Sequence, residues 1–221
     1  MRFRRIAALA ACFVLVVTCL GGFRLYAQPT AYVGIDINPS IELSVNRFGI
    51  VVGSEALNED GAALLDSVSL TNRSYADALA ALTGSDAFAP YAQENSFVEV
   101  SVTSDNQRQV ESLCAQSDAT LSALPCQGAC AVVDAQTRDA AFAAGMGVGR
   151  YNAALELIEL DPSVTLEECA GMSMRELRDR IASYRGDAST PSGAGRGAQG
   201  GRGAGGAGHG AGRGAGWSAG S

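Results

Sequence analysis

Hydrophobic and polar residues alternate in three segments of the chain, in the manner of β-strands. The segments are "AYVGIDI" (31–37), "IELSVNRFGIVVGSEAL" (41–57) and "SFVEVSVTS" (96–104). The sequence "NRFG" (46–49) interrupts the second segment and predicts a hairpin turn there. Together these segments predict a small antiparallel sheet.

Helical spacing dominates the remainder of the chain up to about residue 185. "SYADALAALTG" (74–84) places apolar residues on one face, after a serine cap and before a glycine stop. Three hydroxyl residues are each followed three positions later by Glu or Gln, the capping-box spacing: Ser104 with Gln107, Thr165 with Glu168, and Ser173 with Glu176. These boxes predict helices near 105–123, 166–171 and 174–184. Two more helices are predicted at 137–145 and 149–160, with a helix-to-helix turn at "GMGVG" and a short strand at "AVVDA" (131–135).

The predicted fold class is therefore α+β, with the small antiparallel sheet packed against several helices. Three regions are expected along the chain. Residues 1–27 form a cytoplasmic stub and a transmembrane anchor, residues 28–186 form an extracytoplasmic domain, and residues 187–221 form a disordered Gly/Ala/Arg tail.

The anchor is predicted from an uncharged run over residues 6–23. Arg2, Arg4 and Arg5 precede this run and Arg24 follows it. A helix of that length rises about 27 Å, slightly less than the hydrocarbon thickness of a bilayer, which fits either an anchor or a cleaved signal. The residues that flank the run favour the uncleaved anchor. The arginine asymmetry predicts a single-pass cell-membrane protein whose N-terminus is cytoplasmic and whose bulk is extracytoplasmic.

Charge and composition narrow the chemistry of the domain. Residues 28–186 hold 22 acidic residues and 9 arginines, so 9 − 22 gives a net charge of −13 and argues against nucleic-acid binding. The only histidine, His209, lies in the tail, which excludes histidine triads and histidine metal sites in the domain. The sequence indicates no cofactor and no metal. A wall-active hydrolase that uses a pair of carboxylates remains an alternative, although the sequence does not single out any two acidic residues for this role.

Four cysteines follow the apolar run, and they allow either a zinc site or disulfides. "CQGAC" supplies the only closely spaced pair, whereas four-cysteine zinc sites usually have two such pairs. An oxidising compartment favours one or two disulfides, whose pairing the sequence leaves open. The candidate cysteines are Cys114, Cys126, Cys130 and Cys169.

The dipeptide Asn38-Pro39 lies between the first two strand segments. Proline has no backbone N–H, so the usual route to a succinimide at asparagine is closed. The remaining route is attack by the Asn38 side-chain nitrogen on its own carbonyl carbon, which breaks the chain and frees Pro39. Such a reaction needs a fold that positions the groups, and Asp36, Ser40 and Glu42 are the nearest polar assistants. The alternative is a simple bend between strands.

The block "YVGIDINPSIELSVNRFGIVVGSEALNEDG" (32–61) resembles the extracytoplasmic middle domain of RsgI-type anti-sigma factors. The segment "GVGRYNAALELIELDPSVTLEECAGMSMRELRDRI" (147–181) is similar to the end of the same domain. The resemblance implies autoproteolysis at Asn38 and Pro39, with fragments that stay associated through the sheet. It also implies a protein partner that links the chain to a sigma factor or to a downstream protease.

Only five residues precede the apolar run, so we expect no cytoplasmic sigma-binding domain in this chain. The predicted function is a membrane-anchored extracytoplasmic regulatory domain that cleaves itself once, at Asn38–Pro39, during transmembrane signalling. No enzyme with turnover is expected. The alternatives are a cell-surface interaction module that does not cleave and the wall-active hydrolase.

Overall fold

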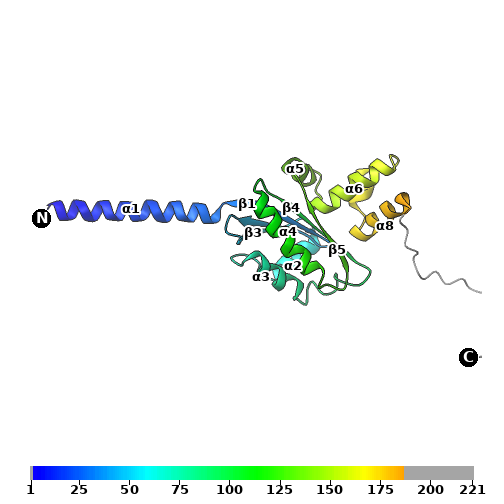
Figure 1. Cartoon of the computed structure of the whole chain (residues 1–221), viewed down its shortest axis with the longest axis horizontal. Helices are drawn as coiled ribbons and strands as arrows, with labels where there is room; N and C mark the ends of the chain where they lie inside the picture. The colour runs from blue at the N-terminus through cyan, green and yellow to red at the C-terminus, as the bar shows by residue number, and fades with distance from the viewer. Residues whose placement is uncertain (1, 187–221) are drawn as a thin grey trace, which may run out of the picture. The chain divides into compact units, whose positions relative to one another are not determined.

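The computed structural model describes residues 2–186, with side chains from residue 13 onward (Figure 1). Its five strands form one sheet in the order β3-β2-β1-β4-β5, so β1 is the central strand. The strands are β1 (Pro29–Asp36), β2 (Ser40–Asn46), β3 (Val51–Ala56), β4 (Phe97–Thr103) and β5 (Gln127–Val132). The hairpin turn predicted at residues 46–49 is confirmed, because β2 and β3 pair antiparallel on either side of it.

The sheet is mixed, so the prediction of a purely antiparallel sheet is wrong at one edge. β4 and β5 are parallel, with Val100 opposite Cys130. The chain returns between them through helix α4 (Gln107–Leu121), and a crossover of this kind is what parallel neighbours require. The strand predicted at 131–135 overlaps the observed strand only at residues 131 and 132, because β5 runs from Gln127 to Val132 and Ala135 already belongs to a helix.

Eight helices lie within the described residues, which confirms the α+β class. They are α1 (Arg2–Ala27), α2 (Glu59–Ser67), α3 (Tyr75–Thr83), α4, α5 (Ala135–Ala143), α6 (Val148–Leu160), α7 (Leu166–Ala170) and α8 (Met174–Arg185). Helix α2 was not predicted from the sequence.

Two of the three predicted capping boxes are present, at Thr165 and Ser173. The third is wrong: α4 begins after Asn106, whose side chain accepts hydrogen bonds from the second and third backbone amides beyond it. The hydroxyl of Ser104 donates instead to the carbonyl of Thr30 at 2.7 Å. A contact with a distant strand has therefore replaced the local cap.

Within the residues that the structure describes, no helix is long and apolar enough to cross a membrane. The span expected at residues 6–23 includes side chains outside the described set. The tail expected at 187–221 also lies outside the described residues, so both expectations stay predictions.

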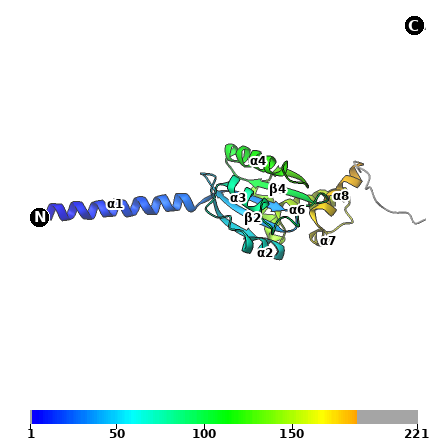
Figure 2. The same cartoon turned by 90° about the horizontal axis from the view of Figure 1, so that it is seen from below.

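The two faces of the sheet differ in chemistry. The apolar face carries residues such as Val33, Leu43 and Val100 into the main core, which α2, α3 and α4 complete (Figure 2). The opposite face is polar and yet buried. Its buried polar residues include Asp36, Ser40, Glu42, Glu99, Ser101 and Thr103.

Helices α5, α6 and α8 contact this polar face, in large part through ion pairs and hydrogen bonds. Arg138 of α5 binds Glu42, and Arg178 of α8 binds Glu99. Helices α6, α7 and α8 bury an apolar cluster of their own, which includes Leu157 and Leu177 and is separate from the main core. The buried polar face thus lies between the main core and this second cluster, and the Asn38–Pro39 loop lies at its edge.

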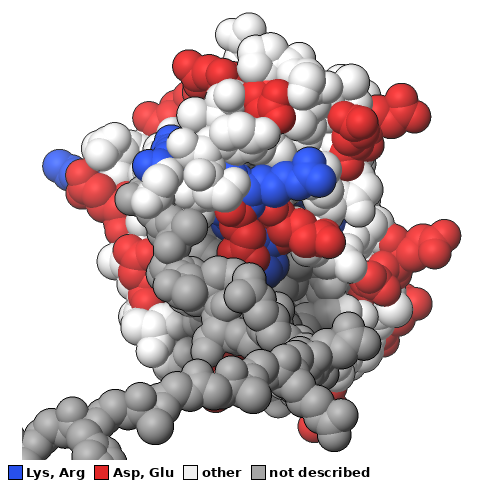
Figure 3. Space-filling view, turned by 90° about the vertical axis from the view of Figure 1, so that its right-hand side faces the viewer, with Lys and Arg blue, Asp and Glu red and all other residues white. Residues whose placement is uncertain are grey.

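The surface carries the acidic excess expected from the composition. Figure 3 shows one end of the domain, where acidic side chains outnumber basic ones. Two arginines, Arg138 and Arg178, are only partly exposed because they bind the buried carboxylates of Glu42 and Glu99.

Candidate functional site

The Asn38–Pro39 bond lies in the loop of the β1–β2 hairpin. Asp36 pairs with Ser40 across the hairpin, which leaves Ile37, Asn38 and Pro39 as the loop. The Ile37 amide donates to the Pro39 carbonyl at 3.1 Å and closes it. The Asn38 side chain is exposed, whereas Pro39 is buried. The dipeptide is therefore held on both sides by paired strands.

The backbone of Asn38 adopts a φ of 96°, in the left-handed half of conformational space. Asparagine enters this region more readily than most residues, but a non-glycine residue there still costs roughly 1–3 kcal/mol. The strained residue, Asn38, is the one whose carbonyl carbon would be attacked in a self-cleavage reaction, and the bond that would break joins this carbon to the Pro39 nitrogen.

Asn58, the N-cap of α2, makes contacts on both sides of the same bond. Its Nδ2 donates to Asn38 Oδ1 at 3.2 Å, while its Oδ1 accepts from the Ser40 amide at 3.0 Å. That Oδ1 also caps the helix by accepting from the Gly61 amide at 2.8 Å. Asn58 therefore ties the residues before and after the bond to the start of a helix.

Arg150 of α6 approaches the loop from the other side. Its Nη2 donates to Ser40 Oγ at 3.0 Å and lies 3.5 Å from Asn38 Oδ1. With two donors directed at Oδ1, the Asn38 amide is oriented through its oxygen. No protein acceptor in the described part of the chain holds its Nδ2, so the nitrogen is left available as a nucleophile.

Asp36 links the loop to α6 from beneath. Its carboxylate accepts from Ser40 Oγ at 2.6 Å and from the Gly149 amide at 2.8 Å, and the residue is fully buried. Helix α6 has no cap from its own N-cap residue, Gly147. Asp36 therefore serves as the cap of α6 from a distant strand and draws Arg150 toward the loop.

Burial raises the pKa of Asp36, against the opposing effects of its hydrogen bonds to Ser40 and Gly149 and of the Arg150 charge. Because the folded pKa is higher than the unfolded one, the folded state binds more protons between those two values. The free energy of unfolding should therefore fall as pH rises through this window.

An Asp36→Asn variant cannot titrate and retains an oxygen for the Gly149 amide. We expect its free energy of unfolding to fall less steeply than that of the wild type as pH rises above the ordinary carboxyl pKa. Denaturant unfolding across a pH series measures the difference. The contributions of the other carboxylates to the pH dependence cancel in the comparison, because both proteins share them. Parallel curves would contradict a raised pKa at Asp36.

The third assistant expected from the sequence, Glu42, is engaged elsewhere. Arg138 binds both of its oxygens and stacks on the Tyr32 ring at 3.8 Å. Burial raises the pKa of Glu42, as it does for Glu99, which Arg178 binds. The structure thus brings Asp36 and Ser40 to the loop and directs Glu42 toward α5.

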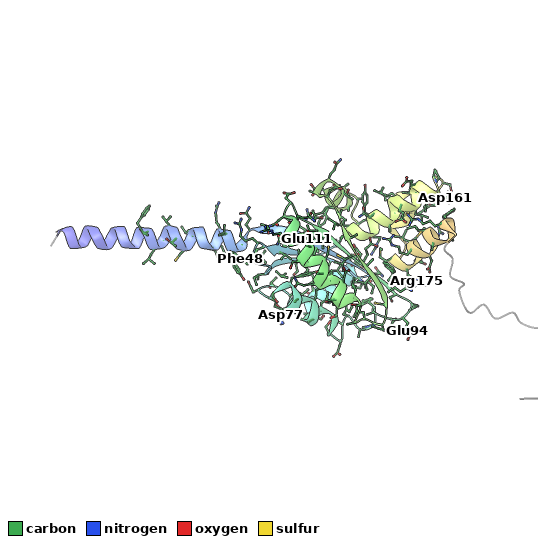
Figure 4. All side chains as sticks on the ribbon, in the orientation of Figure 1. Phe48, Asp77, Glu94, Glu111, Asp161 and Arg175 are labelled. Atoms are coloured by element: carbon green, nitrogen blue, oxygen red, sulfur yellow. The ribbon has the colours of Figure 1, made fainter. Side chains whose placement is uncertain are left out.

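An open hollow lies beside Asn38. It is lined by Tyr91 from the loop after α3 and by Arg175 and Glu176 at the start of α8. Figure 4 shows Arg175 on the α8 side of this region. The loop is accordingly reachable from solvent, which agrees with the exposure of the Asn38 side chain.

Two residues that contribute to the site, Asn58 and Arg150, were not predicted from the sequence. An asparagine followed by Glu59 and Asp60 is a typical helix start, so the α2 cap was detectable. Nothing local connects either residue to Asn38, however, because they are 20 and 112 positions away.

Comparison with known proteins identifies relatives for most of the chain. Residues 30–156 match the family described as the anti-sigma factor RsgI-like central domain. The Anti-sigma-I factor RsgI6 of Acetivibrio thermocellus is 27% identical over 200 residues, covering 81% of this chain and 26% of that protein. RsgI9 of the same organism is 26% identical over 203 residues, covering 85% and 29%.

A third relative, RsgI4 of that organism, is 33% identical over 109 residues, covering 47% of this chain and 21% of its own length. The chain therefore spans about a quarter of the length of these relatives. The family match covers more than half of the chain and includes the whole Asn38–Pro39 hairpin. This chain belongs to the family of RsgI-like central domains of anti-sigma factors.

Proposed function

We propose that this chain is the extracytoplasmic regulatory part of an RsgI-type anti-sigma system and that it cleaves itself once, at Asn38–Pro39. The observation that carries the proposal is the held conformation of Asn38. Its backbone is at φ 96°, and its amide oxygen faces donors from Asn58 and Arg150. Positioning of this kind is what the slow reaction of an asparagine amide requires.

In the proposed reaction, Asn38 Nδ2 attacks the Asn38 carbonyl carbon and loses a proton, while the bond from that carbon to the Pro39 nitrogen breaks. The leaving nitrogen gains a proton and becomes a new N-terminus, and the first fragment ends in a succinimide that water can open. Ser40 directly follows Pro39, and its hydroxyl is hydrogen-bonded to Asp36. We therefore assign to Ser40 the delivery of the proton to the Pro39 nitrogen.

Cleavage would leave the two fragments together. The fragment that ends at Asn38 contains β1, which pairs with β2 on one side and with β4 on the other. Both partners belong to the second fragment. Separation would require β1, a central strand, to leave the sheet and lose its hydrogen bonds to both neighbours. The fragments would therefore stay associated until a later signal separates them.

Membrane anchoring through residues 6–23 is part of the proposal and is supported by the uncharged run and its flanking arginines. The family suggests a sigma factor as the eventual target of the signal, because the relatives are named anti-sigma-I factors. A separate protein that holds the sigma factor, or a downstream protease, would connect the two.

The test is the intact mass of the full chain under denaturing conditions, with a native separation in parallel. We expect two masses, the larger fragment beginning at Pro39, and a single native species. A folded chain that keeps its full mass after days of incubation would overturn the cleavage. It would favour the interaction module, in which the loop is only a bend.

A further inference from the structure

Helix α4 and the edge strand β5, which pack against each other, carry one cysteine each. Cys114 lies on α4, and Cys130 lies on β5 opposite Val100. Helix α4 packs closely on β5, since a Cβ at Gly128 would lie 2.7 Å from the Leu121 side chain. Cys130 is two residues beyond Gly128 in the strand and therefore faces the same helix.

The surroundings of the two thiols place them side by side. Ser117, three residues after Cys114 on the same helix, lies 2.8 Å from the Tyr75 hydroxyl in a buried contact. The Cys114 thiol and the Ser117 hydroxyl are both close enough to the Cys130 thiol to influence its pKa. Both cysteines are partly buried and pack against the main core. They thus pack against the same core, one on a helix and the other on the edge strand beneath it.

A bond between Cys126 and Cys130, and any bond to Cys169, does not fit the fold. Cys126 and Cys130 flank extended backbone, and four residues of strand span roughly 13 Å, beyond the roughly 7 Å that a disulfide allows between Cα atoms. Cys169 is fully buried in the separate cluster of α6, α7 and α8. That cluster lies on the polar side of the sheet, away from Cys114.

We propose that Cys114 and Cys130 form a disulfide that links α4 to β5, although both are free thiols in the structure. The oxidant is a disulfide-bearing thiol reagent of the oxidised-glutathione class. One cysteine attacks this reagent and releases one thiol. The second cysteine then displaces the other, so that two protein thiols are oxidised and one external disulfide is reduced to two thiols.

The timing of the bond follows from its surroundings. Burial and the neighbouring Cys114 thiol raise the pKa of Cys130 to about 12. Because the thiolate is the reactive form, Cys130 should react slowly once the domain is folded. We expect the bond to form during folding, while Cys130 is accessible, and to resist reduction afterwards.

The experiment refolds the reduced full chain in a glutathione redox buffer at about pH 8, traps free thiols by alkylation, and maps the peptides. Trypsin cleaves after Arg108 and Arg138, and a protease that cleaves before aspartate separates residues 109–117 from 118–133. We expect these two peptides to be linked, with Cys126 alkylated. The oxidised chain should melt about 5–10 °C above the reduced chain.

Cys126→Ala is the matched control and should retain both the link and the shift in Tm, whereas Cys114→Ala and Cys130→Ala should lose both. A folded chain in which Cys114 and Cys130 are alkylated or glutathionylated separately would overturn the proposal. A link through Cys126 would overturn it too. The result is independent of cleavage at Asn38, because the readout involves neither fragment mass nor the hairpin.

Discussion

Replacing Asn38 with glycine should leave every chain in one piece, whereas the wild-type chain should separate at Asn38–Pro39 under denaturing conditions. Glycine adopts the φ of 96° without strain, so the hairpin should fold normally. It lacks the side-chain amide, and the proposed reaction then has no nucleophile. Asn38→Ala also lacks the amide and retains the backbone strain. Intact mass after days of incubation should show one full-length species for both variants.

Asn72 provides the matched control. It is another exposed asparagine with positive φ, at 61°, but arginine follows it in place of proline. Asn72→Ala should cleave like the wild type. Arg150→Ala should cleave about 10–100-fold more slowly, because the amide loses a positioning contact. Cleavage that persists in Asn38→Gly would show that the nucleophile lies elsewhere.

Gly147→Ala should destabilise the domain by about 3–5 kcal/mol and slow cleavage with it. A Cβ at this position would lie 1.7 Å from Asp36 Oδ1 and 2.5 Å from its Cγ. Asp36 cannot move aside easily, because it is fully buried and bound to Ser40 and Gly149. The estimate combines overpacking with the loss of a buried hydrogen bond to a carboxylate. Thermal unfolding should show a Tm lower by about 10 °C.

Gly171→Ala is the control for this variant, because its Cβ would meet nothing closer than the Glu168 carbonyl at 3.6 Å. It should change the Tm by only a degree or two. In an Asp36→Ala background the obstructing carboxylate is gone, so the additional cost of Gly147→Ala should fall by more than half. Equal costs in the two backgrounds would show that Asp36 does not determine the requirement for glycine.

Asp36 connects the proposed cleavage to the docking of α6. Asp36 caps the helix, and the first turn of that helix carries Arg150 to the loop. Much of the contact between α5–α8 and the sheet is polar, and the apolar cluster of α6–α8 is separate from the main core. We therefore expect changes that loosen α6 to affect the hairpin as well as the stability of the domain.

Several elements could be predicted from the sequence because local interactions determine them. The capping boxes at Thr165 and Ser173 depend on residues only three positions apart. The hairpin turn at 46–49 follows from the break in an alternating pattern, and α3 follows from apolar spacing after Ser74. The chemistry proposed for Asn38-Pro39 is also local, since it depends on the missing proline N–H.

Other features depend on contacts between residues far apart in the sequence. The parallel placement of β5 depends on where α4 returns the chain, and alternation alone carries no information about strand direction. Burial of Asp36, its raised pKa and its role as a helix cap all require α6 to dock on β1. The approach of Asn58 and Arg150 to Asn38, and of Cys114 to Cys130, likewise arises only when the strands and helices pack. No local rule specifies such contacts, because the free energy that creates them comes from burying surfaces far apart in the sequence.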